Sequence, residues 1–245
     1  QNATNPLQAM QGQTAGVNIA STSGQPGSDM RVTIRGIGTV GDSQPLYIID
    51  GVQGDITTVN ASDIESLDVL KDAASAAIYG SQAANGVVLV TTKQGKAGKA
   101  QISFDAYYGV QNVARTTDML NRDQYITMMQ EQALNSGSAL YDASVFDGAA
   151  DTDWVDQMFT DNAVTENYSL GITGGTDASV YALSLSYIDQ EGIVGGADVS
   201  NYERYGFRVN TEHKLYENIL KVGQHMNFNY IKNNGVAVGN QYSNS

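Results

Sequence analysis

Residues 63–95, DIESLDVLKDAASAAIYGSQAANGVVLVTTKQG, constrain the fold more than any other part of the sequence. The stretch begins with a strand pattern and continues into an Ala-rich run that follows Lys71 and Asp72, with Asp72 at an N-cap position. Tyr79 and Gly80 come where a helix would end, because glycine is favoured just beyond a helix C-terminus. The first half of the stretch therefore predicts a short strand followed by a short helix.

The second half of this stretch predicts a buried strand. Asn85 and Gly86 form a turn signal, and the run VVLVTT that follows at 87–92 is continuous, apolar and β-branched. Such a run is typical of a strand that is buried on both faces. Together these elements predict a compact βαβ-like unit, which an ordinary soluble α/β domain would also contain.

An alternating segment, RVTIR, precedes this unit and places Arg31, Thr33 and Arg35 on one face of a predicted strand. In a soluble domain these arginines would be solvated, whereas inside a barrel they could pair with carboxylates on the wall. Gly36 opens a formal G-x-G-x-x-G, but a dinucleotide site needs this motif at the start of a helix, directly after a strand. Here the glycines lead through polar residues into another strand pattern, LYII, so we predict a loop.

The strand LYII ends at Asp50 and Gly51, a pair that predicts a turn. A carboxylate dyad of Asp50 with Asp55 is the alternative, and no other residue supports it. Residues 1–30 predict a loop around one short amphipathic segment, with a Gly/Ser/Pro linker at 21–28.

Beyond a short basic turn, five runs alternate between apolar and polar side chains, as strands with one apolar face do. The apolar faces are Ile102, Phe104, Ala106 and Tyr108; Tyr168, Leu170 and Ile172; Tyr181, Leu183, Leu185 and Tyr187; Tyr205, Phe207 and Val209; and Leu220, Val222, Met226, Phe228 and Tyr230. The opposite, inner face includes Ser103, Ser184 and Arg208. Each run is long enough for a tilted strand that crosses a bilayer, and the tyrosines recur where an aromatic girdle would place them.

The connections between these runs alternate in length. Those at 174–177 and 215–218 are short, whereas those at 112–166 and 190–203 are long. Outer-membrane barrels show this alternation of short turns and long outer loops. A soluble β-sandwich, whose strands alternate in the same way, is the alternative.

Composition excludes several classes of protein. The chain has 13 Lys and Arg against 26 Asp and Glu, a formal net charge of −13, and so lacks the basic face of a nucleic-acid-binding protein. It contains no cysteine, which excludes disulfides and thiolate metal sites. No apolar run approaches the roughly 18 residues of a transmembrane helix. No arrangement of nucleophile, base or cofactor ligands is visible, so we predict no catalytic residue and no cofactor.

Residues 116–167 hold ten acidic side chains and one basic side chain. Four of the acidic residues are Asp147, Asp151, Asp153 and Asp156. They could hold calcium, but their spacing lacks the glycine and the closing glutamate of an EF-hand loop. We therefore predict a solvated surface loop and no metal site.

Several phrases of the sequence resemble one family. The stretch DIESLDVLKDAASAAIYGSQAANGVVLVTTK resembles the plug domain of TonB-dependent outer-membrane transporters, and KDAASAAIYGSQAANGVVLVTTKQGK resembles the SusC/RagA branch of the Bacteroidetes. The phrases LQAMQGQTAGVNIASTSGQPGS, RVTIRGIG and PLYIIDGV fit this branch in the same order, and YSLGITGGTDASVYALSLSYIDQEGIV is similar to its first barrel hairpin. The plug residues that carry the resemblance are Arg31, Arg35, Gly36, Asp50, Gly51, Lys71, Asp72, Tyr79, Gly80, Asn85 and Gly86.

The resemblance implies a transmembrane, antiparallel β-barrel of about 22 strands with an N-terminal α+β plug domain. Residues 1–99 would be the plug, and residues 100–245 about five strands and loops of the barrel. Five strands with an apolar outer face leave two open edges in lipid, so we expect a longer protein. The TonB-contacting segment would precede the plug, and residues 1–30 offer no candidate for it.

The resemblance also implies active import of a bulky nutrient, an oligosaccharide (glycan) or a peptide, across the bacterial outer membrane, without enzymatic chemistry. Its partners would be the inner-membrane TonB complex, a SusD-like surface lipoprotein and outer-membrane lipid. In related proteins plug loops meet the substrate, which makes Thr39, Asp42, Ser43 and Gln44 candidate contacts; a polar loop packed on the wall is the alternative. A passive surface adhesin and a secreted β-protein acting on polysaccharides are the competing functions.

Overall fold

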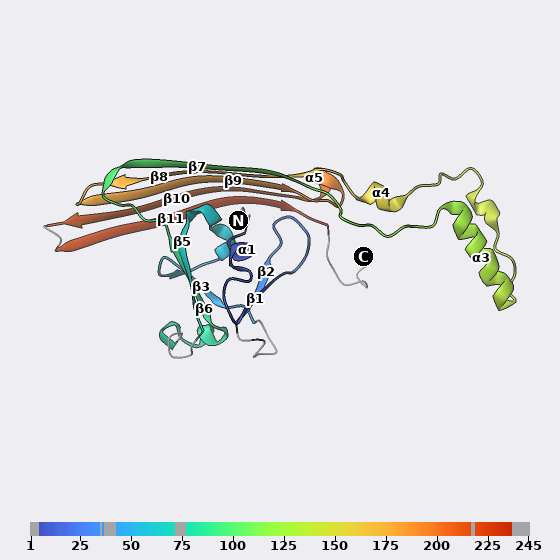
Figure 1. Ribbon diagram of the computed structural model, residues 1–245, viewed down its shortest axis with the longest axis horizontal. Helices are drawn as coiled ribbons and strands as arrows, with labels where there is room; N and C mark the ends of the chain where they lie inside the picture. Colours follow the sequence, from blue (N-terminus) through green and yellow to red (C-terminus); the bar gives the residue numbers. More distant parts are fainter. Residues whose placement is uncertain (1–4, 35, 37–42, 72–76, 217–218, 237–245) are drawn as a thin grey trace.

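The computed structural model describes residues 5–34, 36, 43–71, 77–216 and 219–236 (Figure 1). It consists of an N-terminal domain, the plug, and one long five-stranded sheet, the wall. The plug lies against one face of the wall, called the inner face, and the other face is the outer face (Figure 1). Within the described ranges, no helix has the length and apolar character needed to cross a membrane.

The plug contains a hairpin and a four-stranded mixed sheet of order β4-β3-β6-β5. Its helix and strands are α1 (Pro6–Met10), β1 (Val17–Ser21), β2 (Met30–Ile34), β3 (Leu46–Ile49), β4 (Val52–Gln53), β5 (Ile64–Leu70) and β6 (Val87–Thr92). Helix α1 begins after Asn5, whose side chain accepts a hydrogen bond from the Leu7 N–H at 3.0 Å. Leu7 and Met10 are buried, as the predicted amphipathic segment requires.

Strand β6 is buried, as predicted: Val87, Val88, Val90 and Thr92 are each at most 2% exposed. The two strands of the predicted βαβ-like unit are present, but their parallel arrangement is wrong, and most of the helix predicted between them lies outside the described residues. β5 pairs with β6 antiparallel, and the parallel partner of β6 is β3. The described part of the β5–β6 connection forms 3₁₀ turns on either side of Gly80, which has a φ of 75°. The chain therefore reverses direction instead of crossing over the sheet.

A second difference concerns residues 17–28, which the sequence predicts as loop and linker. Val17–Ser21 forms β1, and the residues that follow close an antiparallel hairpin with β2. Ile19 is the buried residue of β1 and pairs with Val32. Because only Ile19 of β1 is buried, the strand has too few buried positions for alternation along the sequence to distinguish it from a loop.

Two hydrophobic clusters stabilise the plug, and each consists of plug residues. The larger cluster joins α1, the hairpin and β6 through Leu7, Val32 and Val88. The smaller cluster surrounds Ile48 and Val87. Among the described residues, none from the wall belongs to either cluster. The apolar core of the plug therefore closes within the plug.

The wall is an antiparallel meander of order β11-β10-β9-β8-β7. Its strands are β7 (Gly98–Gln111), β8 (Ala163–Gly175), β9 (Ser179–Glu191), β10 (Asn201–Leu215) and β11 (Leu220–Asn234). The long connections contain α3 (Arg122–Ser136), α4 (Trp154–Met158) and α5 (Gly196–Val199), and all three helices lie at one end of the wall (Figure 1). Because β7 begins at Gly98, the predicted boundary after residue 99 falls inside this strand.

The outer face of the wall carries apolar side chains in rows that run across the strands. Tyr168, Tyr187, Tyr205 and Tyr230 are cross-strand neighbours, with successive ring centroids 6.3, 4.9 and 6.3 Å apart. The next row is formed by Phe104, Leu170, Leu185, Phe207 and Phe228. The predicted alternation and the predicted aromatic row are thereby confirmed.

Replacing Leu185 with arginine should destabilise the protein in a bilayer by about 2–4 kcal/mol. Leu185 is 52% exposed in the second apolar row of the outer face, where the arginine would bring a charge into hydrocarbon. Denaturant titration of the full-length protein in lipid vesicles measures the loss.

Leu140→Arg is the control for this change, because Leu140 is 64% exposed in the long connection between β7 and β8. A charge there stays in water and should leave the unfolding free energy almost unchanged. Equal losses for the two variants would contradict the assignment of the outer face to lipid.

Candidate functional site: the seam between plug and wall

The interface between the plug and the inner face of the wall is the candidate site and is called the seam below. Its wall side is built from small or polar residues that alternate with the apolar outer residues. The wall residues beside a narrow cavity of about 30 Å³ include Ser103, Ser169, Gly171, Ala182 and Ser184, together with Asp105, Thr173, Leu183 and Arg208. Such side chains let the plug approach closely and supply hydroxyl groups for hydrogen bonds.

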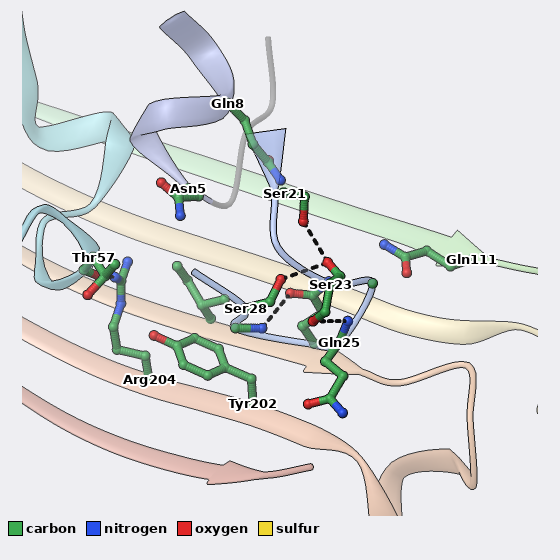
Figure 2. A pocket seen from close by; sticks show the side chains of 14 residues that line it. Asn5, Gln8, Ser21, Ser23, Gln25, Ser28, Thr57, Gln111, Tyr202 and Arg204 are labelled. Carbon is green, nitrogen blue, oxygen red and sulfur yellow. Dashed lines mark hydrogen bonds between the residues drawn. The ribbon is translucent and has the colours of Figure 1, made fainter. Parts of the chain in front are cut away.

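A larger cavity of about 200 Å³, the polar cavity, opens where α1 and the β1–β2 loop face β9 and β10 (Figure 2). Arg204 and Tyr202 extend into this region from β10 (Figure 2). Arg204 is 2% exposed, and its Nη1 donates to the Thr57 carbonyl oxygen of the plug. Tyr202, Asp63 and Asp55 also interact electrostatically with its guanidinium. Arg204 is therefore a buried cation at the edge of a polar cavity.

The β1–β2 loop packs against the ring of Tyr202 at Gly27. Gly27 has a φ of 63°, and a Cβ placed there would lie 2.1 Å from Tyr202 Cδ2. Its N–H also faces Gln190 Oε1 on β9, at 3.4 Å. A side chain at position 27 would therefore push the loop away from the wall.

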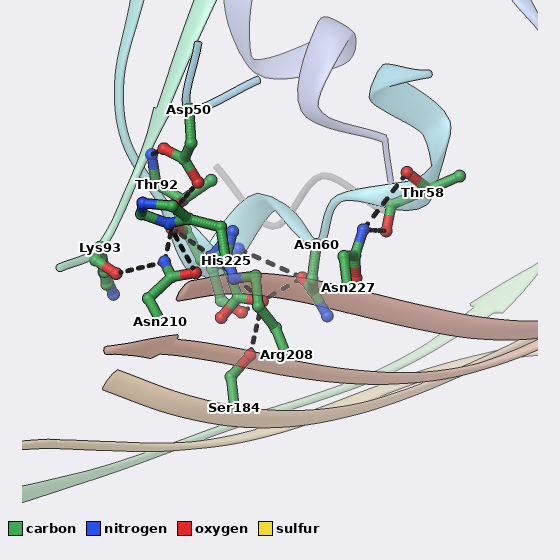
Figure 3. A network of polar contacts seen from close by, with 12 residues as sticks. Asp50, Thr58, Asn60, Thr92, Lys93, Ser184, Arg208, Asn210, His225 and Asn227 are labelled. Atoms are coloured by element: carbon green, nitrogen blue, oxygen red, sulfur yellow. Dashed lines mark hydrogen bonds and ion pairs between the residues drawn. The ribbon is translucent and has the colours of Figure 1, made fainter. Parts of the chain in front are cut away.

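A buried ion pair holds the plug further along β10 (Figure 3). Arg208 Nη2 lies 3.6 Å from Asp63 Oδ2 and donates to the Asp63 carbonyl oxygen at 3.1 Å. Ser184 on β9 donates to the same carboxylate at 2.7 Å. The side chains of Arg208 and Asp63 are 9% and 14% exposed, so solvent screens the pair only weakly.

A directed chain of hydrogen bonds joins the wall to the β3–β4 turn (Figure 3). The Asn210 Nδ2 donates to Thr92 Oγ1 at 2.9 Å and to the Lys93 carbonyl oxygen at 3.2 Å. The Thr92 hydroxyl donates to the Asp50 carboxylate, which also accepts the Thr92 N–H at 2.9 Å. Because the Asn210 amide donates toward the plug, its oxygen accepts from His225 Nδ1, 3.2 Å away. The chain thus connects β11, β10 and β6 with Asp50.

Asp50 and Gly51 form the predicted turn, with φ values of 49° and 89°. Asp55, the other member of the alternative dyad, caps a 3₁₀ turn by accepting the Thr57 N–H at 2.8 Å. The two carboxylates therefore bind different backbone segments, and their contacts are structural.

The predicted substrate contacts divide into two pairs. Thr39 and Asp42 lie outside the described residues. Ser43 is 4% exposed and accepts a hydrogen bond from Arg31 Nη2 at 3.2 Å. The Gln44 amide accepts from and donates to the backbone of β2, at 3.3 and 3.2 Å. Neither Ser43 nor Gln44 lines the polar cavity, and the substrate role of all four residues stays a prediction.

The arginines of the described seam come from the wall, and the carboxylate comes from the plug. The sequence interpretation paired Arg31 and Arg35 of the plug with carboxylates on the wall. Arg31 instead bonds to Ser43 within the plug, and Arg35 lies outside the described residues. The polarity of the described ion pair is therefore the reverse of the one expected.

Two motif residues tie the β5–β6 connection to the rest of the plug. Gly86 has a φ of 95°, and a Cβ there would lie 2.7 Å from Ile34 Cδ1 on β2. Asn85 Nδ2 donates to the Gln44 carbonyl oxygen at 3.4 Å. Both contacts bring the end of this connection against the segment that leads into β3.

Two of the remaining motif residues, Lys71 and Tyr79, have local structural contacts. Lys71 Nζ donates to the Ala15 carbonyl oxygen, and Tyr79 packs against the smaller hydrophobic cluster. Gly36 has a φ of 88°. Asp72 lies outside the described residues.

The acidic segment uses its carboxylates locally. Asp153 caps α4 by accepting the Val155 and Asp156 N–H groups at 2.9 and 3.1 Å. Asp151 accepts the Arg122 N–H at 2.9 Å, at the start of α3. The described residues contain no group of three or more potential metal ligands.

Sequence reasoning assigned Arg208 to the inner face but missed Arg204 and Asp63 as residues of the seam. One signal was available. Arg204 and Arg208 are four residues apart on one face of a strand, and a buried arginine requires a compensating partner. The partner itself was not accessible to pattern reasoning, because Asp63 precedes Arg208 by 145 residues.

The chain is similar to known proteins both in sequence and in structure. The family profile described as "TonB-dependent Receptor Plug Domain" matches residues 1–87. TonB-dependent receptor P26 of Formosa agariphila is 37% identical over 95% of this chain, and SusC of Bacteroides thetaiotaomicron is 35% identical over 96%. In both cases the match spans 24% of the relative, so the chain covers about a quarter of the length of these curated relatives.

A solved structure agrees with the sequence comparisons. The RagAB peptide importer in its closed-closed state aligns over 94% of this chain and 29% of its own, with a TM-score of 0.80 and 31% identity. The alignment includes the plug and the wall together, because it spans nearly the whole chain. The chain therefore belongs to the SusC/RagA family of TonB-dependent outer-membrane receptors and contains its plug domain and part of its barrel wall.

Proposed function

We propose that this chain is part of an active importer that moves a bulky nutrient, an oligosaccharide or a peptide, across the outer membrane. A TonB complex in the inner membrane would supply the force on the plug, and a SusD-like lipoprotein would cover the barrel on the cell surface. The observation that carries the proposal is the chemistry of the seam. Both apolar clusters consist of plug residues, and the recorded side-chain bonds between plug and wall are hydrogen bonds and an ion pair, with Ile188 and Tyr202 as larger wall residues beside them.

A polar seam suits a plug that must move. Separating two apolar surfaces costs about 25 cal/mol for every Å² that becomes exposed to water. A neutral hydrogen bond has a smaller net value, about 0.5–1.5 kcal/mol, because water replaces the lost partner. The contacts of Asn210 and Ser184 can be rehydrated in this way, while the plug core stays closed.

The relatives support transport in preference to the two competing functions. They are receptors and an importer by description, and none is described as an enzyme or an adhesin. In the described seam, the carboxylates of Asp50 and Asp63 bind plug or wall groups, which leaves neither free for acid–base chemistry. We therefore assign no catalytic step to this chain.

A disulfide between plug and wall tests the proposal. In the native protein, Ser184 Oγ lies 2.7 Å from Asp63 Oδ2. In a full-length protein with Asp63→Cys and Ser184→Cys, oxidation should therefore link the plug to β9 by a disulfide. Because Asp63→Cys also removes the carboxylate partner of Arg208, the reference is the same variant in its reduced form. We expect its uptake to fall at least tenfold after oxidation and to return to the reduced level after reduction. Uptake is measured with a labelled nutrient in cells with and without TonB.

A disulfide within the wall is the matched control. Ser169 and Ser186 are cross-strand neighbours on the inner face, so the pair Ser169→Cys and Ser186→Cys joins β8 to β9 and leaves the plug free. Oxidation of this pair should not change uptake. If the oxidised variant with Asp63→Cys and Ser184→Cys takes up the nutrient normally, an import mechanism that displaces the plug is contradicted.

We also propose that Thr39 and Asp42, which lie outside the described residues, contact the substrate. Thr39→Ala with Asp42→Ala should weaken ligand binding about three- to tenfold, since a hydroxyl and a carboxylate hydrogen-bond sugars and peptides. Ser43 and Gln44 are left intact because they hold β2. Calorimetry on the full-length complex is the measurement, and unchanged affinity would rule out these two contacts.

A further inference from the structure

The outer face of the wall, which lies away from the plug (Figure 1), carries an apolar groove of about 420 Å³, called the outer groove. Two rows of bulky side chains form its sides, one of tyrosines and one of phenylalanines and leucines. The residues between these rows are Ser169, Ser186 and Gly206, which are neighbours across β8, β9 and β10. They alternate with the outer residues and turn to the inner face, so they leave a channel that runs across the strands.

The lining of the outer groove is aromatic and aliphatic. Its large side chains are Phe104, Leu170, Leu185, Phe207 and Phe228 on one side, and Tyr168, Tyr187 and Tyr205 on the other. Among the described residues, no charged one lines it. Barrel strands tilt by about 35–45°, so a channel across them is inclined to the bilayer and can be followed by a flexible chain.

The outer groove is continuous with the apolar surface of the wall. In outer-membrane receptors, the family to which this chain belongs, that surface faces lipid. An acyl chain of a membrane lipid therefore fits both the lining of the groove and its surroundings.

A row of charged residues, the charged row, borders the tyrosine side of the groove. Glu166, Asp189, Glu203 and Lys232 are successive neighbours across β8, β9, β10 and β11. Each lies two positions from a tyrosine along its strand, a rise of roughly 6–7 Å. The Tyr187 hydroxyl also donates to Asp189 Oδ2 at 3.2 Å. The charged row is therefore close enough to contact the headgroup of a lipid whose chain lies in the groove.

The charged row contains three carboxylates and one ammonium group. Lys232 Nζ lies 3.7 Å from Glu203 Oε2, and Asp189 accepts from the neutral Asn201 Nδ2 at 2.7 Å. Like charges on directly opposite residues are destabilising, so a further cation would stabilise the row. Within the described ranges, no three potential ligands are grouped to hold a metal ion. An organic ammonium group suits the row better, because its three donors can reach neighbouring carboxylates.

We propose that the outer groove and the charged row form a binding site for an outer-membrane lipid whose headgroup contains a phosphate and a primary amine. One acyl chain lies in the groove, the amine contacts Glu166 and Asp189, and the phosphate lies near Lys232. The site is on the outer face of the wall, so this inference goes beyond the import function and does not depend on the nutrient.

Native mass spectrometry of the full-length protein, freed of lipid in a mild detergent, tests the headgroup preference. The probes are phosphatidylethanolamine and phosphatidylglycerol with the same two palmitoyl chains, supplied in equal amounts. Both contain the phosphate, but only the first has the amine. The complex with one phosphatidylethanolamine should be at least threefold more abundant than the complex with one phosphatidylglycerol. Equal abundance, or an excess of phosphatidylglycerol, would overturn the proposal.

A charge variant assigns this preference to the charged row. Glu166→Gln with Asp189→Asn should lower the abundance ratio at least twofold, because the amine loses both carboxylates. Asp118→Asn with Glu131→Gln is the matched control, since it removes the same charge from exposed positions in the long connection between β7 and β8. If the ratio is the same in the two double variants, the preference arises elsewhere and the proposal fails.

A bulky substitution tests the groove itself. Leu185→Trp fills part of the groove and should lower the occupancy of the first phosphatidylethanolamine at least threefold. Met226→Trp is the control, because Met226 is 42% exposed on the outer face and does not line the groove. Unheated gels, on which folded barrels migrate faster, verify the fold of both variants. Equal lipid occupancy in the two variants would overturn the proposal, as would a native dimer that Leu185→Trp alone dissociates, since a second copy would then occupy the groove.

Discussion

Replacing Val88 with aspartate should prevent the plug from folding, with a loss of more than about 4 kcal/mol. Val88 is fully buried in β6, the strand that pairs with both β3 and β5, and belongs to the larger hydrophobic cluster. The substitution removes apolar contacts and buries a carboxyl group that has no partner nearby. A domain is stable by only about 5–15 kcal/mol, so this loss removes most of the margin.

Protease digestion of outer membranes that contain the full-length variant measures the effect. We expect cleavage throughout residues 5–97 and little new cleavage in the wall. Val52→Asp is the matched control, because Val52 is 69% exposed on β4 and an aspartate there remains in water. A Val88→Asp plug that resists protease as well as the control does would show that β6 is not the centre of the fold.

Replacing Asp63 with asparagine should loosen the plug from the wall by about 3–5 kcal/mol. The change keeps the size of the side chain but removes the nearest carboxylate from Arg208, whose side chain is 9% exposed, and leaves Asp50 as the more distant counter-charge. The cost arises mainly from that poorly compensated buried charge. Faster amide hydrogen exchange in β5 and greater permeability of cells to large antibiotics should accompany it.

Glu65→Gln is the control for this substitution. Glu65 pairs with Lys96 at 3.3 Å, but the two side chains are 44% and 78% exposed, and exposed pairs contribute about 0–1 kcal/mol. The double variant Asp63→Asn with Arg208→Met should recover part of the loss, because neither charge remains. Equal effects of Asp63→Asn and Glu65→Gln would mean that the buried pair does not hold the plug.

The sequence predicted the features that depend on neighbours along the chain. The two-residue alternation of Phe104, Leu185 and Phe207 identifies the outer face, because a strand turns successive side chains to opposite sides. The apolar run at β6 likewise predicted its burial. In both cases the information needed is contained within about ten residues.

Features that depend on distant residues were not accessible in the same way. The run at β6 could not reveal that its parallel partner is β3 or that β5 returns antiparallel, since pairing is chosen by the whole sheet. The seam depends on even longer separations, such as that of Thr92 and Asn210, which are 118 positions apart. In the sequence Asn210 is one polar residue among many. Its role at the seam becomes visible only when the fold brings it against Thr92 and Lys93 of the plug.

The confinement of both hydrophobic clusters to the plug also affects how the sequence can vary. A change at Ser184 or Asn210 alters a hydrogen bond at the seam but leaves the packing of Leu7, Val32 and Val88 untouched. The inner surface of the wall can therefore accumulate substitutions, one polar group at a time, without compensating changes inside the plug. Selection for a new nutrient could act on that surface while the domain that it encloses keeps the same interior.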